Sequence, residues 1–352
     1  MFSWKLLPGA IRRYGYAFTW GRAWNFGKVA VSFALSRILR RDVRFGQPCV
    51  LMIEPTSFCN LKCPLCPSGN GALGRARGNM ALTHFYHVLD QAAGHIFLLM
   101  LWNQGEPFIH KDLLDMVRYA RSRRIPTITS TNVHFIRTPQ DARDIVESGL
   151  DEIIVSLDGV TPESYARYRV GGDFERVVEG IRLLCEARRD LRADNPLVHL
   201  QFIIMKHNEG EIGQARTLAR RLGADRLSLK TAQVYTQADA EAFLPTHERH
   251  SRYRYDAEGL VTKAPVVNSC KHLWYSTVVN WDGSVSPCCF DKDGRHSLGN
   301  AFNGKTLSQV WEGVAYRDFR RAVLSDRASI PMCSNCSEGL KGLFYDIEDL
   351  RK

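Results

Sequence analysis

The sequence predicts an α/β fold, a partial (β/α)6 barrel followed by a small C-terminal domain built from a β-hairpin and a helix. Three observations support this prediction. Between residues 49 and 234, short apolar runs alternate with amphipathic segments, the pattern of a parallel sheet with right-handed helical crossovers. The 352 residues, 45% hydrophobic and 24% charged, suffice for a barrel-sized core and a second module. A polar stretch at 235–260 separates the two parts.

The barrel is predicted from six apolar runs and the segments between them. The runs have the length and composition of buried strands and span residues 49–55, 95–107, 127–132, 151–159, 197–208 and 224–234. The expected helices carry apolar residues at helical spacing and span 83–94, 110–124, 139–149, 173–190 and 209–223. The carboxyl ends of parallel strands meet on one face, so polar residues at those ends are candidates for function.

The chain is expected to divide into a basic amphipathic extension, the barrel, a connector and a C-terminal domain, at 1–48, 49–235, 236–262 and 263–352. The extension holds most of the net charge of +10, with nine Lys and Arg against one Asp. We expect this segment either to lie on an anionic membrane surface or to pack as a basic helix on the main domain. Its apolar residues recur at near-helical spacing: Trp20, Trp24, Val31, Leu35 and Ile38.

Cysteine usage and the apolar runs indicate the compartment. Ten cysteines are too few for a disulfide scaffold in a chain of this length, and their clustering is typical of metal sites in a reducing environment. Basic residues interrupt the N-terminal apolar stretch, and no run is long enough to cross a bilayer. We therefore expect a cytoplasmic protein, either free or peripheral at the inner face of the membrane.

Three cysteines lie directly after the first predicted strand. The stretch EPTSFCNLKCPLCPSG, residues 54–69, contains Cys59, Cys63 and Cys66. Structural zinc takes four ligands, so a zinc site here needs a distant fourth one. A cubane iron-sulfur cluster held by three thiolates keeps one iron open for a reagent. Three thiolates without a nearby fourth ligand favour the cluster.

This motif, together with WNQGEP at the end of the second strand, resembles the radical S-adenosylmethionine (SAM) superfamily. The superfamily has a Gly-Gly-Glu-Pro element at that strand end, and here Gln104 replaces the first glycine. The resemblance implies a 4Fe-4S cluster whose open iron is chelated by SAM, and a 5′-deoxyadenosyl radical that removes a hydrogen atom from the substrate. It also implies an external one-electron reductant of the flavodoxin or ferredoxin type.

The same resemblance implies contacts to SAM or substrate at the strand ends. Gly105 and Glu106 belong to the second strand's element, and Glu106 would accept a hydrogen bond from the SAM amino group. Its alternative role is that of a turn or helix-capping residue. The further implied contacts, most of which could equally be turn residues, are Ser130, Asn132, Ser156, Asp158 and Arg169.

Four more cysteines, in the C-terminal domain, fit a closed centre, either zinc or a fully ligated 4Fe-4S cluster: Cys270, Cys288, Cys333 and Cys336. The first two bracket a predicted hairpin that turns at 281–283, and a helix is expected before the last two. The spacing of Cys270, Gly283 and Cys288 resembles the SPASM domain of radical SAM enzymes, which implies the cluster. Since no cysteine follows Cys336, the resemblance is to the shortened, twitch-type form with one auxiliary cluster, as in a cyclitol dehydrogenase of the superfamily.

The remaining cysteines are Cys49, Cys185 and Cys289. Cys49 and Cys185 stand in apolar patterns and are expected to be buried, unreactive thiols. Cys289 adjoins a predicted ligand and is a candidate catalytic hydrogen donor, an alternative ligand, or a half-buried strand residue.

These features predict a radical SAM oxidoreductase of the dehydrogenase type. The expected substrate is a small molecule (a sugar, a cyclitol or a membrane-presented metabolite), which the auxiliary cluster oxidises after a C–H bond is broken. The alternatives are a redox-neutral epimerase, which needs a donor such as Cys289, and a peptide-modifying SPASM maturase, for whose usual winged-helix module residues 1–48 are too short and basic. A zinc-containing nucleic-acid-binding protein would leave WNQGEP unexplained, so nucleic acid is not an expected partner.

Overall fold

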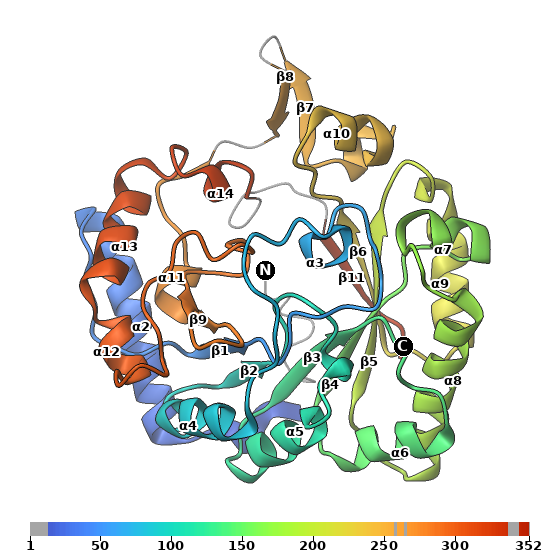
Figure 1. Cartoon of the computed structure of the whole chain (residues 1–352), viewed down its shortest axis with the longest axis horizontal. Helices are drawn as coiled ribbons and strands as arrows, with labels where there is room; N and C mark the ends of the chain where they lie inside the picture. Colours follow the sequence, from blue (N-terminus) through green and yellow to red (C-terminus); the bar gives the residue numbers. More distant parts are fainter. Residues whose placement is uncertain (1–12, 257–258, 264–265, 337–344, 352) are drawn as a thin grey trace.

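A nine-stranded sheet forms the centre of the structure, a computed structural model that describes residues 13–256, 259–263, 266–336 and 345–351. The strand order is β10-β9-β1-β2-β3-β4-β5-β6-β11 (Figure 1). The six predicted strands are confirmed as β1 to β6, which pair in parallel in chain order. They are shorter than the apolar runs and span Val50–Ile53, Leu98–Met100, Thr127–Thr131, Glu152–Ser156, Leu197–Ile204 and Arg226–Thr231.

The predicted helices follow these strands and cover the outer side of the sheet (Figure 1). They are α4 (Leu82–Ala92), α5 (Leu113–Ser122), α6 (Pro139–Glu147), α8 (Phe174–Asp190) and α9 (Ile212–Arg221), the last preceded by η4 (Glu209–Glu211). Apolar side chains from strands and helices form one continuous core, which confirms the partial barrel. Three short elements were not predicted, because they are too short for a periodic pattern: α3 (Pro67–Asn70), η3 (Pro107–Ile109) and α7 (Pro162–Tyr168).

The C-terminal part of the chain extends the sheet at both edges. The predicted hairpin is β9 (Ser276–Val279) and β10 (Val285–Ser286), and β9 pairs in parallel with β1. Strand β11 (Tyr345–Asp349) pairs antiparallel with β6. The division of the chain into domains stays a prediction. Strands from the C-terminal part and from the barrel nevertheless belong to one sheet. The helices of this part are α11 (His272–Tyr275), α12 (Leu307–Trp311), α13 (Val314–Asp326) and α14 (Pro331–Ser334), of which α13 is the helix expected before the last cysteines.

The predicted connector contains regular structure that the polar composition of 236–262 did not reveal. It folds into α10 (Gln237–Phe243), η5 (Glu248–His250) and the hairpin β7 (Tyr253–Asp256) and β8 (Gly259–Thr262). This hairpin projects at the top of Figure 1.

The N-terminal extension forms η2 (Gly15–Ala17) and α2 (Trp20–Leu39), and residues 1–12 lie outside the described part. Helix α2 packs on the main domain across the segments that lead into several strands. The side-chain amide of Asn25 donates to the Gln47 carbonyl at 2.9 Å, in the segment before β1. The Arg22 guanidinium donates to the Arg124 carbonyl at 2.6 Å, in the segment before β3. The helix therefore covers the amino ends of the parallel strands.

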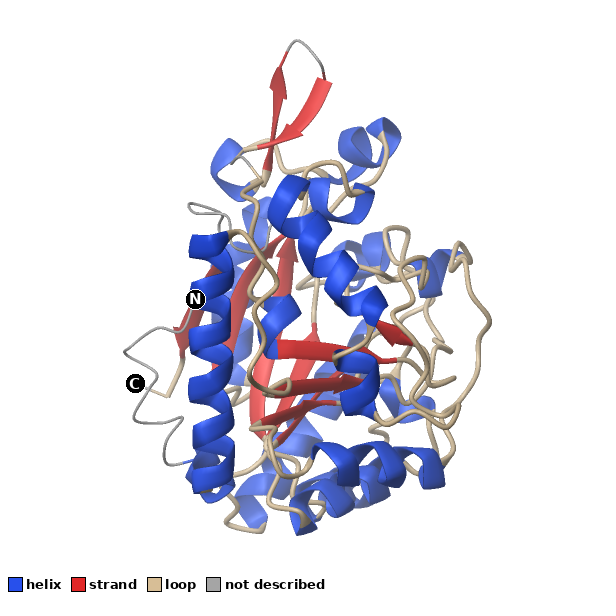
Figure 2. Ribbon diagram, turned by 90° about the vertical axis from the view of Figure 1, so that its left-hand side faces the viewer, coloured by secondary structure: helices blue, strands red, loops and turns tan. Residues whose placement is uncertain are grey.

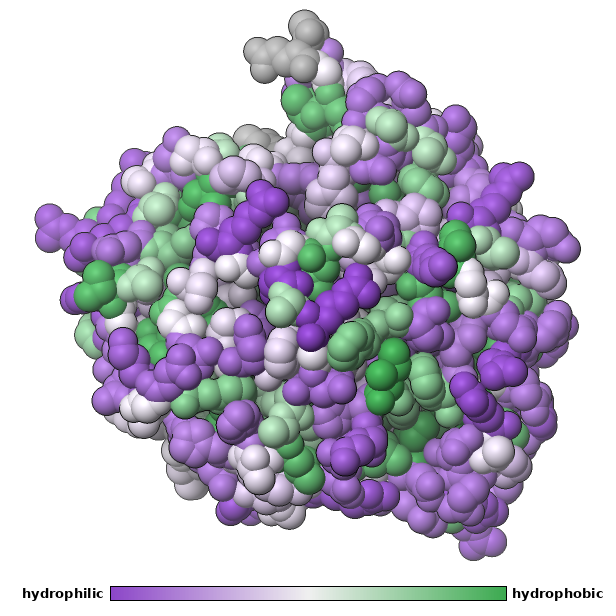
Figure 3. Space-filling model, viewed as in Figure 1, coloured by the Kyte–Doolittle hydropathy of each residue, from purple (hydrophilic) through white to green (hydrophobic). Residues whose placement is uncertain are grey.

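The two ends of the barrel differ in what covers them. In Figure 2, α2 runs along the left edge, where the parallel strands start, and loops that follow the strands lie on the right. The right-hand end of that view is the face seen in Figure 1, and Figure 3 shows it as mostly hydrophilic, with apolar side chains in small groups. Among the helices of the described residues, none is long and apolar enough to cross a membrane.

Candidate active site

The first cysteine set lies on the loop that leaves β1 at the carboxyl end of the sheet. The Lys62 amide donates to the Val170 carbonyl at 2.8 Å, and the Cys66 amide donates to the Cys63 carbonyl at 3.1 Å, so backbone bonds shape the loop. Apolar side chains surround the three thiols and shield them from water. These neighbours include Leu61, Leu65, Tyr168 and Met205.

The pKa values of the thiols in this loop fit a site that binds positively charged iron. Burial raises the pKa of Cys59 to about 12, with smaller contributions from the Glu106 carboxylate and the other two thiols. Burial likewise raises the pKa of Cys63, although the Arg169 guanidinium, 3.8 Å from its sulfur, lowers it. Thiols so placed become thiolates when iron supplies positive charge. The three cysteines would hold a cubane cluster, and among the described residues no three His, Cys, Asp or Glu side chains are arranged to hold a single metal ion.

The second strand's element packs directly on the cysteine loop. Gly105 has a φ of +79°, and a Cβ there would lie 2.5 Å from the Thr56 carbonyl oxygen and 2.7 Å from that of Phe58. Only glycine fits this left-handed position so close to another backbone. The Glu106 amide donates to the Phe58 carbonyl at 2.7 Å, which joins the two segments.

Glu106 is buried and already hydrogen bonded. Its carboxylate accepts from the Asn132 amide at 2.7 Å, the Thr131 hydroxyl at 2.8 Å and the Phe108 amide at 3.2 Å, the last as the cap of η3. Burial raises its pKa to about 7, although these donors favour the charged form. The capping role is therefore present in the structure, and the contact to SAM stays a prediction.

The predicted residues of the third and fourth strands lie at the same end of the sheet. The Asn132 amide group donates to the Asn60 side chain, on the cysteine loop, at 2.8 Å. Ser130 is half buried in β3 and Ser156 is buried in β4. Asn132 is thus brought to the first cysteine set by a direct hydrogen bond, while no recorded contact joins the two serines to it.

Asp158 and Arg169 form a buried ion pair beside the cysteines. The Arg169 Nε donates to the Asp158 carboxylate at 2.6 Å, and the Ile203 amide donates to the other carboxylate oxygen at 2.7 Å. Burial alone would lower the pKa of Arg169, but Asp158 and Cys63 together raise it. The guanidinium lies near the first cysteine set and Asp158 fixes its orientation, while its contact to SAM or substrate stays a prediction.

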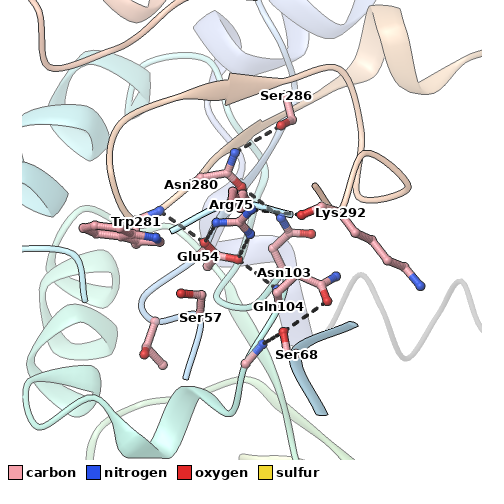
Figure 4. A network of polar contacts seen from close by, with 12 residues as sticks. Glu54, Ser57, Ser68, Arg75, Asn103, Gln104, Asn280, Trp281, Ser286 and Lys292 are labelled. Carbon is pink, nitrogen blue, oxygen red and sulfur yellow. Dashed lines mark hydrogen bonds and ion pairs between the residues drawn. The ribbon is translucent and has the colours of Figure 1, made fainter. Parts of the chain in front are cut away.

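A buried carboxylate that we did not predict from the sequence joins three segments of the site (Figure 4). Glu54 lies directly after β1 and is 0% exposed. Its carboxylate accepts hydrogen bonds from the Arg75 guanidinium at 2.8 Å, from the Gln104 backbone amide at 3.1 Å and from the Trp281 backbone amide at 3.4 Å. Arg75 also donates to the Lys292 carbonyl at 2.9 Å. The signal was available, because Glu54 is a polar residue at a strand's carboxyl end like those that were predicted.

Gln104, the departure from the superfamily's glycine, has a local partner. Its side-chain oxygen accepts from the Ser68 hydroxyl at 3.3 Å, and that hydroxyl accepts from the Gly105 amide at 3.2 Å. Ser68 lies on α3, the short helix that begins directly after Cys66. The larger side chain therefore connects the second strand's element to the segment that carries the cysteines.

Three cysteines of the second set, Cys270, Cys333 and Cys336, lie near Arg327. Burial raises the pKa values of Cys270, Cys288 and Cys333, and Cys336 raises each of the three further. Arg327 is 1% exposed and donates to the Ser269 carbonyl at 2.8 Å. Its pKa is raised by Cys270, Cys336 and Cys333 despite its burial. A set of four cysteines, three of them near a buried cation, suits a closed, negatively charged cluster.

The other cysteines lie as predicted from their patterns. Cys49 and Cys185 are buried, and burial raises their pKa values to about 12 and about 11. Cys289 is half buried. It lies near Lys230 of β6, whose pKa burial lowers and Cys289 raises. This places Cys289 beside the barrel wall, and its catalytic role stays a prediction.

The parallel partial barrel, the open set of three cysteines and the closed set of four define an iron-sulfur protein of the radical type. The family models agree: residues 53–215 match the radical SAM superfamily, and residues 270–337 match the SPASM iron-sulfur cluster-binding domain. The chain therefore contains a radical SAM domain and a SPASM domain. These domains imply SAM and 4Fe-4S clusters as its cofactors.

Several curated proteins are similar over most of the chain. A tungsten-containing aldehyde ferredoxin oxidoreductase cofactor-modifying protein of Pyrococcus furiosus is 24% identical over 82% of this chain and 86% of its own. A PqqA peptide cyclase of Ruegeria pomeroyi is 27% identical over 78% and 76%. The mycofactocin maturase MftC of Mycobacterium ulcerans is 25% identical over 82% and 80%.

Solved structures share the fold at low identity. SuiB of Streptococcus suis bound to SAM has a TM-score of 0.60 at 14% identity, covering 84% of this chain and 78% of its own. BtrN in complex with SAM and 2-DOIA has a TM-score of 0.52 at 17% identity, covering 83% and 94%. These likenesses confirm the fold class, and the closer resemblance to a twitch-type dehydrogenase stays a prediction.

The contact at Gly105 predicts a specific failure of the first cluster. In Gly105→Ala, the methyl group would push against the backbone of the cysteine loop, so we expect iron content to drop and 5′-deoxyadenosine formation to fall tenfold or more. Gly171→Ala is the matched control, because Gly171 has a similar φ of +82° but open space around it. Iron analysis and SAM cleavage would be measured on both, and equal losses would refute the steric explanation.

The raised pKa of Glu106 predicts a pH-dependent affinity for SAM if its carboxylate accepts from the amino group. Below a pKa of about 7 the carboxyl is neutral and the charge-assisted bond is lost. One pH unit below that value, we expect the contribution of the Glu106 carboxylate to SAM binding to weaken by about tenfold. Calorimetry on anaerobically reconstituted protein would show a steeper loss of affinity with falling pH for wild type than for Glu106→Gln. The same slope in both would remove Glu106 from this role.

Proposed function

We propose that this chain is a radical SAM enzyme that modifies a peptide substrate with the help of one auxiliary 4Fe-4S cluster. The observation that carries the proposal is the parallel pairing of β9 with β1. The first cysteine set follows β1, and Cys288 follows the β9-β10 hairpin, so one sheet supports an open and a closed cysteine set in the same molecule.

The substrate class differs from the one we expected from the sequence. From the sequence we expected oxidation of a small molecule, because a closed auxiliary cluster can accept an electron from the substrate. The similar proteins named for peptide chemistry, the PqqA cyclase and the mycofactocin maturase, extend over 78% and 82% of this chain. Similarity of that length supports a peptide as substrate.

The residues of the site have separable tasks in this proposal. SAM, when bound, would supply the radical chemistry for hydrogen abstraction from the substrate. Cys59, Cys63 and Cys66 would hold the cluster that binds SAM, and the Glu106 carboxylate would orient the SAM amino group. Arg169 keeps positive charge beside Cys63 and is itself held by Asp158. The apolar shell around the loop excludes water, which limits unwanted reactions of a radical.

Oxidation of a small molecule is the second candidate. It is the expectation from the sequence, in which Cys270, Gly283 and Cys288 resemble a SPASM-type domain with one auxiliary cluster. In either case the reducing electron comes from an external donor of the flavodoxin or ferredoxin type. A redox-neutral epimerase would require a cysteine as hydrogen donor, either Cys289 or Cys49.

The substrate class can be tested without knowing the substrate. Reconstituted protein would be mixed with SAM, dithionite and the low-molecular-mass fraction of an extract from source cells grown with deuterated nutrients. Deuterium in 5′-deoxyadenosine reports hydrogen abstraction from a substrate. We expect labelling that disappears when the fraction is first digested with a protease that is then inactivated. Labelling that survives digestion would favour the small molecule.

The two cysteine sets predict two clusters. We expect about eight irons per chain in wild type and about four in a Cys59→Ala, Cys63→Ala, Cys66→Ala variant, which would no longer cleave SAM. A Cys333→Ala, Cys336→Ala variant is the complementary control and should also fall to about four irons while still cleaving SAM. Zinc in place of iron would contradict the enzyme proposal and support a binding protein.

A further inference from the structure

Most buried side chains of helix α2 are polar, and several of its exposed side chains are apolar. Its buried residues are Arg22, Asn25, Val29, Ser32 and Ser36, four of them polar. The residues that point away from the protein include Trp20, 82% exposed, Trp24, 72%, Val31, 51%, and Ile38, 75%. We name these last four the outer face of α2. Their spacing places all four on one side of the helix.

The polar inner side is explained by what it covers. Arg22 donates to the carbonyls of Ala17, Ala93, Arg123 and Arg124 at 2.6 to 3.1 Å. The Phe45 amide donates to Ser32 at 2.8 Å, and the Val43 amide donates to Ser36 at 2.9 Å. These bonds satisfy backbone groups at the amino ends of the strands. These polar residues therefore fasten α2 to the barrel together with Val29, which lies in the core, and Phe33, which packs against it. The four residues of the outer face take no part in these contacts.

Positive charge borders the outer face. Lys28 and Arg37 lie on α2, and Arg40 and Arg41 follow directly after it. The single acidic residue among 1–48 is Asp42, whose side chain is 3% exposed and pairs with Arg44 at 3.0 Å and with Arg320 at 3.9 Å. The negative charge of this segment points inward, and the exposed charge is positive.

We propose that the outer face of α2 is a docking site for an anionic lipid bilayer. Exposed tryptophans prefer the membrane–water interface, because the ring is apolar and the N–H is polar. Apolar residues bordered by cations form the surface that binds anionic lipid. A second copy of this chain would meet the same positive charge, which opposes self-association. The inference is independent of the proposed substrate.

Vesicle co-sedimentation of the full-length, reconstituted protein tests the proposal. Wild type should bind vesicles of phosphatidylcholine and phosphatidylglycerol, bind pure phosphatidylcholine much less, and lose most binding at high salt. A Trp20→Ser, Trp24→Ser, Ile38→Ser variant should lose tenfold or more in affinity. Each basic residue near an anionic surface is worth about fivefold in affinity, so Arg37→Gln, Arg40→Gln, Arg41→Gln should lose about a hundredfold.

The control variant is Tyr255→Ser, Val314→Ser, because these side chains are 59% and 60% exposed on β7 and α13. It should bind like wild type, and SAM cleavage by every variant verifies folding. Absence of binding to anionic vesicles overturns the proposal. The proposal is also overturned if light scattering shows a dimer that the tryptophan variant disrupts, because a second copy of the chain then covers the outer face. Binding that appears only after deletion of residues 1–12 also overturns it, because the chain itself then covers the face.

Discussion

The buried carboxylate of Glu54 is the interaction on which the arrangement of the site depends. It lies at the end of β1 and is bound by Arg75, by the Gln104 amide and by the Trp281 amide. These groups belong to the loop after the first cysteine set, the second strand's element and the turn of the β9-β10 hairpin. Removing the cation from a buried pair is strongly destabilising, by about 3 to 5 kcal/mol, so the three segments are held as a unit. Because hydrogen bonds are directional, a carboxylate that accepts several of them fixes both the orientation of the three segments and the distances between them.

The continuous sheet connects the segments that carry the two cysteine sets. Strands β1 and β9 are parallel neighbours, and the backbone ladder allows little relative movement between them. The loop of the first set leaves β1, and the second set begins just before β9 and continues after β10. Trp281 strengthens this junction, since its indole donates to the Ala76 carbonyl at 3.2 Å. A rigid junction keeps the distance between two redox centres constant.

The fold could be predicted largely because its information is local. Strand and helix periodicity identifies β1 to β6 and their helices, whereas Glu106, Asn132 and Asp158 are site residues that the resemblance to the radical SAM superfamily implies. The resemblance did not point to Glu54, which stands at the end of an apolar run. Other features depend on partners far along the chain: Arg75 with Glu54, β9 with β1, and Arg327 with the second cysteine set. No pattern of spacing encodes such pairings. Helix α2 was predicted as a helix, but only the structure shows which side faces inward.

The position of α2 also bears on how a substrate reaches the site. The helix covers the amino ends of the strands, whereas the cysteine loop leaves β1 at the carboxyl end, so the two lie at opposite ends of the barrel (Figure 2). A surface bound by α2 would leave the cysteine loop turned toward water. The metabolite presented by a membrane, which we considered from the sequence, would have to leave that membrane to reach the loop. A water-soluble peptide approaches this end directly, and the mostly hydrophilic face around it is what such a substrate would meet (Figure 3).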